Sequence, residues 1–546
     1  MTYEFYPKDF KGQEDSIKLL LEAAKKMDEV IGCTMGPEGQ LVMYEESEKN
    51  PWPTVTKDGV SVATMVRFID QSKNMGAQFI IQAACKQVQE TGDGTTLTTI
   101  LIYKIYEQCI NLIESGQTIN YVVKNIKDLI NQTIDHLNKA AKKKLTKAEL
   151  EWIATISSNN DKELGKLIAE AVWKTGKFGL VSKQPNPDTK HYVKYQEGYT
   201  LNTGITNQKF VNCPNGAVRV DNPYVFICDQ DIFYAKRITN IIKLIKEDAD
   251  KSEDKEKPSL VLISPTISNE LMNVFARNTS DPKTKIKLYW MKPTKNLAPE
   301  KRQFVMEDIA TLTGGFFVSK ECGFDIEGLT LDKIGRVRLI SQNQNETMFM
   351  GYDKKLSALR VTQLKALKKD TKIEQKKDFA AESIARLMGG IATIYVGGAN
   401  DSEQLEIIDR VDDAIRACKS ALEEGYVAGG GVEFLKIISQ LAIKDTDFAD
   451  SIMSILQYPA QKILKNAGRT DWKDIIHRIT FNDSQGYDIK TGADQDMREV
   501  GIIDPTMVLT RALKNSLSSA VSMLRTAVMI IHDYQGIKTL REFEGG

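Results

Sequence analysis

The sequence predicts a multidomain α+β protein in which both ends of the chain build one mainly α-helical domain, and an α/β domain is inserted between them. With 546 residues, the chain is several times longer than a typical domain. Apolar residues recur at helical spacing up to about residue 175 and again after about residue 391. From about 190 to 390, short β-rich runs alternate with helical segments and polar loops.

The composition excludes several classes of protein. Hydrophobic residues make up 42% and charged residues 27% of the chain, which rules out fibrous and wholly disordered proteins. Lys plus Arg and Asp plus Glu both number 73, so we expect no nucleic-acid partner bound through net charge. The mixed charges of segments 251–257 and 365–377 favour solvated helix faces or loops over nucleic-acid patches. Because no apolar run reaches about 18 residues and no secretory signal is visible, we expect a cytoplasmic protein without a membrane segment.

Cysteine and histidine usage narrows the chemistry. The seven cysteines are scattered without a CxxC pair, and each of the four histidines stands alone. A disulfide framework or a thiolate zinc site would need closer clustering. We therefore expect carboxylates and backbone amides to perform most of any catalysis.

Two helices are predicted near the N-terminus. The first has an apolar face and ends at a break at Gly36-Pro37, and its stripe consists of Ile17, Leu20, Leu21, Ala24 and Ile31. The second begins near Thr95, and its stripe consists of Leu97, Ile100, Leu101, Ile105, Cys109 and Leu112. Further helical pattern runs from 118 to about 175, and runs such as 224–228 and 260–263 predict strands in the middle of the chain.

The segment Gly92-Asp93-Gly94-Thr95-Thr96 directly precedes the second helix. Glycine lets the backbone approach a ligand, and the free amides at a helix start favour anions such as phosphates. Asp93 could bind the Mg²⁺ that accompanies a nucleotide. A capped helix start without a ligand is the alternative, and it stays open at this point. No GxxxxGK[ST] motif occurs, so a P-loop nucleotide site is excluded.

Two further turns have a similar composition. Thr34-Met35-Gly36-Pro37 closes the first helix, and Lys57-Asp58 stands at a turn before an apolar run. Backbone at either turn could touch a nucleotide, although each taken alone is more typical of an ordinary turn.

Near the C-terminal third, residues 409–425 predict a helix stopped by Gly425. Asp413 lies roughly opposite its apolar stripe of Val411, Ala414, Ile415, Cys418 and Leu422. An acidic residue in the first turn commonly compensates the helix dipole, but it could instead orient or deprotonate an attacking water. Gly429-Gly430-Gly431 follows, where backbone can pack flush against a ligand.

Together and in this order, these segments resemble the group I chaperonins of the bacterial GroEL type over essentially the full chain. The blocks that carry the resemblance are 34–37, 56–62, 92–96, 155–157, 308–315, 424–431 and 501–506. The resemblance implies an equatorial ATP-binding domain (1–139 and 424–546), an intermediate hinge domain (140–196 and 391–423) and an apical polypeptide-binding domain (197–390).

The resemblance also implies an ATP site. Asp413 would act on the attacking water with help from Asp58, and Asp93 would hold Mg²⁺. The remaining ATP-binding positions would be Thr34, Met35, Gly36, Pro37, Lys57, Gly94, Thr95, Thr96, Leu97, Gly430, Asp488 and Asp504. A K⁺ ion would sit near Thr34 and Lys57. Leu97 replaces a threonine and Asp488 an asparagine of the family pattern, which changes the surroundings of the nucleotide.

Partners follow from the same resemblance. Non-native polypeptides would bind apolar residues of the apical domain, namely Ile205, Phe210, Ile241, Ile242 and Met272. The subunits would form homo-oligomeric, heptameric rings, with a co-chaperonin as a further partner. Asn111, Gln461 and Thr470 stand where the family commonly has charged residues at the ring–ring contact, so we expect weakened stacking of two rings.

The predicted function is that of an ATP-dependent chaperonin: a ring that binds non-native polypeptides and promotes their folding through ATP binding and hydrolysis. The alternative is a ring-forming scaffold or holdase without productive ATP cycling, motivated by Leu97 and Asp488. A monomeric ATP-dependent transferase is the third possibility.

Overall fold

The computed structural model describes residues 8–532, apart from 46–52, 252–256, 294–298, 320–325, 482–484 and positions 178, 202, 215, 282, 345, 372 and 444. The chain divides into two compact units. The terminal unit contains 1–170 and 398–546, and the inserted unit contains 171–397. Within the described residues, no helix is both long enough and apolar enough to cross a membrane.

The terminal unit is mainly helical, as predicted. Its helices are α1 (Gln13–Gly32), α2 (Gly59–Met65), α3 (Gln71–Thr91), α4 (Thr95–Glu114), α5 (Ile119–Ala140), α6 (Lys147–Ser157), α13 (Asp401–Glu424), α14 (Val432–Ile438), α15 (Thr446–Asn466), α16 (Trp472–Phe481) and α17 (Thr506–Leu524). Helix α7 (Lys162–Thr175) runs across the boundary into the inserted unit.

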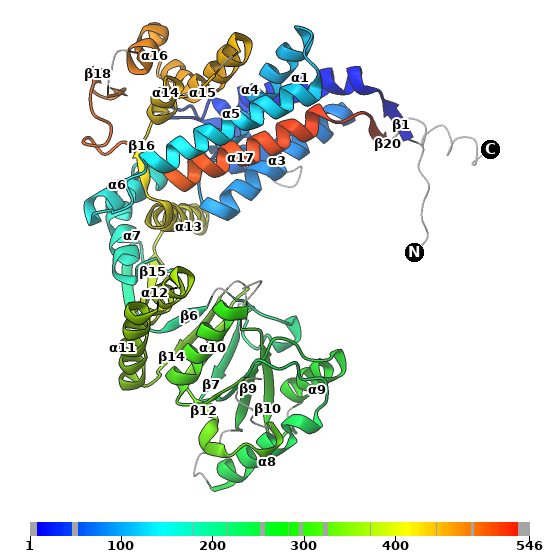
Figure 1. Cartoon of the computed structure of the whole chain (residues 1–546), viewed down its shortest axis with the longest axis vertical. Helices are drawn as coiled ribbons and strands as arrows, with labels where there is room; N and C mark the ends of the chain where they lie inside the picture. The colour runs from blue at the N-terminus through cyan, green and yellow to red at the C-terminus, as the bar shows by residue number, and fades with distance from the viewer. Residues whose placement is uncertain are drawn as a thin grey trace, which may run out of the picture. The chain divides into compact units, whose positions relative to one another are not determined.

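Helix α4 is the centre of this unit. Helices α1, α3, α15 and α17 all pack against it, so segments from both chain ends share one core (Figure 1). The sequence of α4 is apolar around most of its circumference, which is typical of a helix buried on all sides. Every residue of its predicted apolar stripe is buried, which confirms that prediction.

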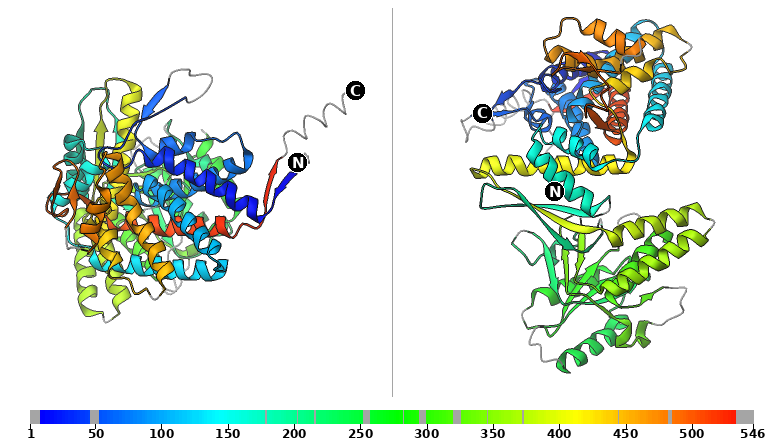
Figure 2. Two further views of the ribbon diagram at one scale, coloured as in Figure 1. Left: turned by 90° about the horizontal axis from the view of Figure 1, so that it is seen from above. Right: turned by 90° about the vertical axis from the view of Figure 1, so that its left-hand side faces the viewer.

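Among the described residues of the terminal unit, four two-stranded sheets accompany the helices. They pair β1 (Lys8–Lys11) with β20 (Met529–His532), β2 (Val42–Tyr44) with β3 (Thr54–Thr56), β16 (Tyr426–Ala428) with β19 (Ile503–Pro505), and β17 (Tyr487–Asp488) with β18 (Ala493–Asp494). In β1 and β20, Lys8 pairs with His532 and Lys11 with Met529. This ribbon extends beyond the helices of its unit (Figure 2).

The inserted unit is built from sheets and helices. A parallel sheet of order β10-β9-β8-β11, with β12 antiparallel to β8, contains β8 (Tyr224–Cys228), β9 (Ser259–Ile263), β10 (Lys287–Met291), β11 (Phe317–Val318) and β12 (Gly335–Arg336). An antiparallel sheet contains β6 (Tyr199–Leu201), β14 (Thr347–Met350), β13 (Leu339–Gln342) and β7 (Val218–Asp221). A third sheet contains β4 (Leu180–Pro185), β15 (Gly390–Val396) and β5 (Tyr192–Glu197).

Five α-helices belong to the inserted unit within its described residues: α8 (Lys236–Lys251), α9 (Asn269–Ser280), α10 (Pro299–Thr313), α11 (Lys354–Asp370) and α12 (Glu374–Met388). Short 3₁₀ turns lie at Gln208–Phe210, Ile326–Gly328 and Leu331–Lys333. The charged stretch from 365 to 370 forms the exposed end of α11, as expected for a solvated helix face. Positions 252–256 of the other charged stretch lie outside the described residues.

The multidomain α+β class with an inserted middle is thus confirmed. The three-domain division with its boundaries stays a prediction. One helix differs from expectation: α13 begins at Asp401, eight residues before the predicted start at 409. The Asn400 side chain caps it by accepting a hydrogen bond from the Glu403 amide. Asp413 therefore lies in the middle of the helix, where compensation of the helix dipole does not explain it.

Candidate functional site

A cavity of about 880 Å³ opens in the terminal unit. It is bordered by the turn after α1, the starts of α2 and α4, one face of α13 and the segment around β17. All fifteen residues that the sequence assigns to catalysis, nucleotide or magnesium line it: Thr34, Met35, Gly36, Pro37, Lys57, Asp58, Asp93, Gly94, Thr95, Thr96, Leu97, Asp413, Gly430, Asp488 and Asp504. The structure therefore brings together segments that lie hundreds of residues apart.

The turn at 92–94 joins α3 to α4 at the cavity wall. Gly92 and Gly94 both have left-handed backbone, with φ of 77° and 90°. The Gly94 amide donates to Asp93 Oδ1 at 2.5 Å, and the Ser157 hydroxyl lies 3.4 Å from Asp93 Oδ2. No side chain caps the N-terminus of α4, so its first amides stay available to an anion. The Asp93 carboxylate thus takes the amide of the N-cap residue Gly94, as the capped alternative expects, while no side chain of the N-cap residue caps the amides that follow.

The turn at 34–37 is held from two sides. The Thr34 hydroxyl donates to the Ile31 carbonyl at 2.8 Å, and the Lys57 ammonium donates to the Pro37 carbonyl at 3.1 Å. From α15, the Asn466 amide donates to the carbonyls of Gly32 and Met35, both at 2.9 Å. Partial burial lowers the pKa of Lys57.

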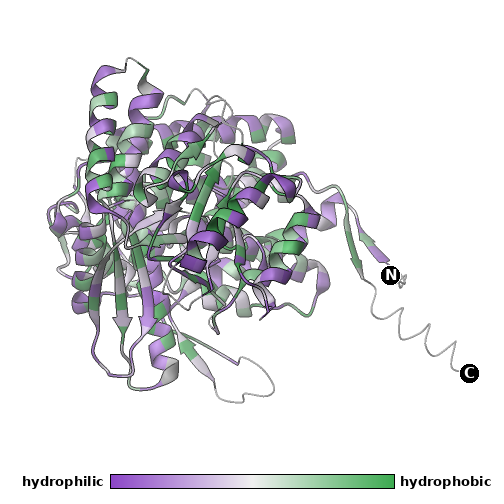
Figure 3. Ribbon diagram, turned by 90° about the horizontal axis from the view of Figure 1, so that it is seen from below, coloured by the Kyte–Doolittle hydropathy of each residue, from purple (hydrophilic) through white to green (hydrophobic). Residues whose placement is uncertain are grey.

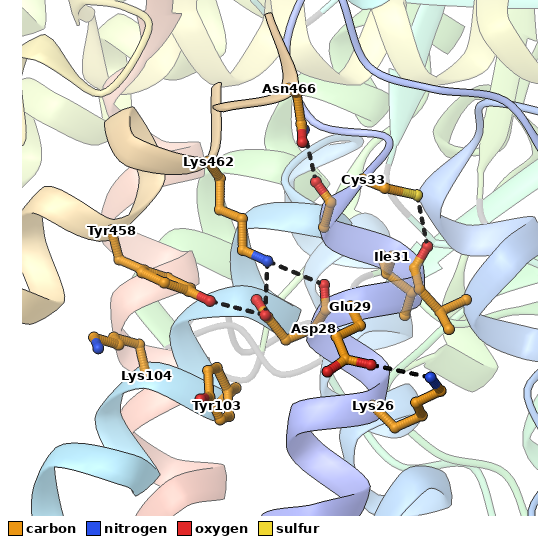
Figure 4. Close-up of polar contacts among 12 residues, drawn as sticks. Lys26, Asp28, Glu29, Ile31, Cys33, Tyr103, Lys104, Tyr458, Lys462 and Asn466 are labelled. Atoms are coloured by element: carbon orange, nitrogen blue, oxygen red, sulfur yellow. Dashed lines mark hydrogen bonds and ion pairs between the residues drawn. The ribbon is translucent and has the colours of Figure 1, made fainter. Parts of the chain in front are cut away.

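A largely buried ion pair joins α1 to α15 about one helical turn before the end of α1. Asp28 accepts from the Lys462 ammonium at 2.7 Å and from the Tyr458 hydroxyl at 2.8 Å (Figure 4). Burial nevertheless raises the pKa of Asp28, because desolvation outweighs these two partners. Together with Asn466, this pair fixes the end of α1 from which the 34–37 turn emerges.

The Asp58 side chain forms hydrogen bonds at the start of α2. Its carboxylate caps α2 by accepting from the Val60 amide at 3.3 Å, the Ser61 amide at 2.8 Å and the Ser61 hydroxyl at 2.6 Å. The side chain is exposed at the cavity wall, so it remains accessible to a ligand.

Asp413 reaches the cavity because α13 lies against the end of α3. The Arg416 guanidinium donates to the Val88 carbonyl at 3.2 Å, and the Ser420 hydroxyl donates to the Thr91 carbonyl at 3.2 Å. Arg416 also pairs with Asp412 on its own helix. These contacts hold α13 with Asp413 facing the same space as Asp93.

The cavity concentrates negative charge. Burial raises the pKa of Asp413 to about 7, and the charges of Asp93 and Asp58 add to this effect. Burial and the charge of Asp93 likewise raise the pKa of Asp504 to about 7. Desolvation by the surrounding protein also raises the pKa of Asp93, although its side chain is open to the cavity. A bound cation would relieve all three carboxylates.

Leu97 and Asp488, the two site residues that depart from the family pattern, have different surroundings. Leu97 lines the cavity but is only 7% exposed and belongs to the hydrophobic core of the terminal unit. Asp488 is 8% exposed, and its carboxylate accepts from the Lys490 amide at 2.9 Å and the Thr491 hydroxyl at 3.0 Å. Asp488 therefore stabilises its own turn.

Several cavity residues were not singled out as site residues from the sequence. Trp152 and Ser157 lie on α6 and Asn160 lies just after it, while Arg410 lies one turn before Asp413 on α13. The 155–157 block belonged to the resemblance and was the available signal for Ser157. Gln87, buried beneath the 92–94 turn, carried no signal.

Comparison with known proteins identifies the family. The model of the TCP-1/cpn60 chaperonin family matches residues 27–533. The chain belongs to this family. Among solved structures, this chaperonin is similar to chaperonin gp146 from a bacteriophage EL of Pseudomonas aeruginosa, crystallised in the presence of ATP-BeFx. Two crystal forms give TM-scores of 0.75 and 0.72 at 21% identity, covering 96% of this chain and 99% of that chain.

The predicted polypeptide-binding residues of this chaperonin divide into two groups. Phe210 and Ile241 are 1% and 0% exposed and pack in the core of the inserted unit, which corrects their assignment to a binding surface. Ile205, Ile242 and Met272 are partly exposed at the edge of that core. Phe233 (51% exposed), Tyr234 (73%) and Val274 (45%) are the more accessible apolar side chains on and next to α9.

Proposed function

We propose that this chaperonin binds ATP with Mg²⁺ in the cavity of the terminal unit, hydrolyses it, and uses the cycle to fold non-native polypeptides. The observation that carries the proposal is that Asp413 and Asp93, which are 320 positions apart, line one cavity together with every other predicted ATP-site residue.

Magnesium fits the residues present. In the described part of the chain, no group of three histidine, cysteine, aspartate or glutamate side chains could hold a metal alone. Mg²⁺ commonly takes one or two carboxylates, with water and substrate phosphates completing its shell. Asp93, desolvated and surrounded by like charges, suits that role. When bound, the ion would neutralise charge on the phosphates.

The chain's own groups would perform the remaining chemistry. The free amides at the start of α4 and the hydroxyls of Thr95 and Thr96 would hold phosphate oxygens. Asp413 would orient the attacking water and accept its proton, and Asp58 would assist. Burial raises the pKa of Asp413 to about 7, and a bound cation would lower it, so this carboxylate would be deprotonated and able to act as a base at neutral pH. Potassium near Thr34 and Lys57 stays a prediction.

Ring formation is supported by two ribbons of the terminal unit. Among the described residues, the β1/β20 and β2/β3 ribbons are both two-stranded sheets. Phe10 (63% exposed), Ile530 (54%) and Met43 (67%) project from them, and Figure 3 shows hydrophobic colouring along β20. Exposed apolar edges pair readily with another chain, and a second copy of this subunit is the partner that we propose.

Client binding is proposed for the surface formed by Phe233, Tyr234, Val274 and the exposed parts of Ile242 and Met272. This surface lies in the inserted unit and offers apolar contacts. Such patches are typical of protein-interaction sites.

Steady-state phosphate release from ATP, measured with and without an unfolded client, tests the proposal. We expect Mg²⁺-dependent turnover together with recovery of client activity. Client binding without phosphate release would instead establish the holdase.

A further inference from the structure

A buried polar network lies directly beneath the 92–94 turn. Its centre is Gln87, which sits on α3 and is 0% exposed. The Gln87 amide nitrogen lies 3.2 Å from the Asp93 carbonyl and 3.0 Å from the Val508 carbonyl of α17. One side chain thus joins the last turn of α3, the 92–94 turn and α17.

Two neighbours hold the Gln87 amide in place. The Asn515 amide of α17 donates to Gln87 Oε1 at 3.0 Å, which fixes which end of the carboxamide faces the turn. The Thr91 hydroxyl, also 0% exposed, lies 3.0 Å from the Gln87 amide nitrogen. Its one proton can go to the Asp93 carbonyl or to the Gln87 main-chain carbonyl, both at 2.9 Å. The Asp93 carbonyl therefore lies within hydrogen-bond distance of two groups of α3, the Gln87 amide and the Thr91 hydroxyl.

This arrangement acts on the peptide that precedes Gly94. With its carbonyl held inward by Gln87 and Thr91, the Asp93–Gly94 peptide directs its amide toward Asp93 Oδ1. The Asp93 side chain then faces the cavity. A Cβ on Gly94 would stand 2.9 Å from both the Gln87 amide nitrogen and Val508 Cγ1, so the network also leaves no room for another residue there.

We propose that Gln87, oriented by Asn515, is a positioning residue that holds the Asp93 carboxylate in the geometry needed for the metal-bound nucleotide. The inference rests on the proposed ATP function. Groups that support a metal ligand without touching the metal commonly change metal affinity by about 10- to 100-fold when removed. A buried amide without hydrogen-bond partners destabilises a protein. The side chains of Gln87 and Asn515 satisfy each other and the turn, which a pair of apolar side chains of the same size could not do.

The variant Gln87→Met keeps the length of the side chain and removes its hydrogen bonds. Asn515→Ala loosens Gln87 without touching the turn, and it serves if Gln87→Met does not fold. Thr133→Val is the matched control, because Thr133 is equally buried but bonds the Leu129 carbonyl within α5.

Two measurements are made on the full chain. Hydrogen exchange of the backbone amides of residues 91–98, measured without nucleotide, reports how often the 92–94 turn opens. Mn²⁺ binding in the presence of a non-hydrolysable ATP analogue, followed by electron paramagnetic resonance, reports the metal site. We expect faster exchange and about tenfold weaker Mn²⁺ binding for Gln87→Met, a smaller change for Asn515→Ala and none for Thr133→Val.

Unchanged exchange in 91–98, or faster exchange with wild-type Mn²⁺ affinity, would overturn the positioning role while leaving the ATP function intact. Failure of the wild-type protein to bind the Mn²⁺–nucleotide complex would overturn the proposed function, and this inference with it.

Discussion

Gly92 lies directly against the main chain of Asp413: a Cβ at Gly92 would stand 2.8 Å from the Asp413 carbonyl oxygen. The same Cβ would also collide with Arg416. The absence of a side chain at Gly92 therefore allows α13 to approach the end of α3 closely enough for Asp413 to share a cavity with Asp93.

We predict that Gly92→Ala slows ATP hydrolysis by about 10- to 100-fold, because displacing a reacting group by about 1 Å has effects of this size. Gly116→Ala is the control, since Gly116 also has a positive φ, 102°, but a Cβ there would meet nothing within 4 Å. Both variants carry the same kind of backbone strain, about 1–2 kcal/mol. Equal turnover of the two variants in a phosphate-release assay would contradict the close-approach argument.

Asp413→Ala should leave ATP binding intact and slow hydrolysis about tenfold or more, a loss of about 1.4 kcal/mol of transition-state stabilisation. Asp409→Asn is the matched control, because Asp409 lines the same cavity one turn earlier on α13 and has no assigned role. Single-turnover hydrolysis and nucleotide titration separate the two effects. Wild-type turnover in Asp413→Ala would remove this residue from the mechanism.

The pH dependence of kcat/KM for ATP should show an acidic limb with an apparent pKa near 7. The pKa of Asp413 is raised to about 7, and a base must be deprotonated to act, so activity should rise with pH through this value. Asp504 has a similarly raised pKa. If the acidic limb persists in Asp504→Asn, Asp413 is supported as its origin. If the limb disappears in that variant, it is assigned to Asp504.

Glu149 should contribute acid-sensitive stability. The Glu149 carboxylate accepts from the Lys142 ammonium and the Thr146 amide, both at 2.7 Å, and from the Tyr426 hydroxyl at 2.5 Å. Although partial burial opposes it, these partners lower the pKa of Glu149 to about 2. The stabilisation is fully present above the unfolded-state pKa near 4.3 and is lost as pH falls toward about 2.

Urea unfolding between pH 3 and 7 measures this contribution. Glu149→Gln should lower the free energy of unfolding at neutral pH by about 1–3 kcal/mol and flatten its acid dependence. Glu29→Gln, which removes only an exposed pair with Lys26 at 3.0 Å, should change it by less than about 1 kcal/mol. An acid dependence identical to that of the wild type would show that Glu149 does not carry it.

Native mass measured with and without nucleotide tests the ring–ring prediction. Asn111 and Thr470 are exposed and Gln461 is partly exposed, so they offer no charged contact to a second ring. We expect single rings during at least part of the cycle. A double ring that persists under all conditions would contradict this expectation.

Much of the fold could be predicted because periodic patterns report burial directly. The stripe of α4 is one example, since each apolar position predicted from spacing lies in the core. The start of α13 was wrong because the apolar stripe begins late, while the capping residue Asn400 stands well upstream of it. Spacing shows which face is buried but not where an exposed helix end begins.

Site residues could be predicted from the sequence only where the residue type itself indicates a chemical role. Gly92 could be singled out because it is a glycine, and Asp93 and Asp413 because they are carboxylates. Gln87 was missed because a glutamine in a helix is ordinary, and its importance arises from the carbonyls that the fold brings beneath the turn. Phe210 and Ile241 were misplaced because apolar character does not distinguish a side chain that packs on a sheet from one that meets a client.

The pairing of Lys8 with His532 has a consequence for biosynthesis. The terminal unit needs strands and helices from both ends of the chain, and α17 fills the core around α4. A ribosome must therefore release nearly the whole polypeptide before this unit can close, whereas residues 171–397 are complete much earlier. During translation, α1 and α3 can pack against α4 early, but the part of α4 that α17 covers stays exposed until the C-terminal segments emerge.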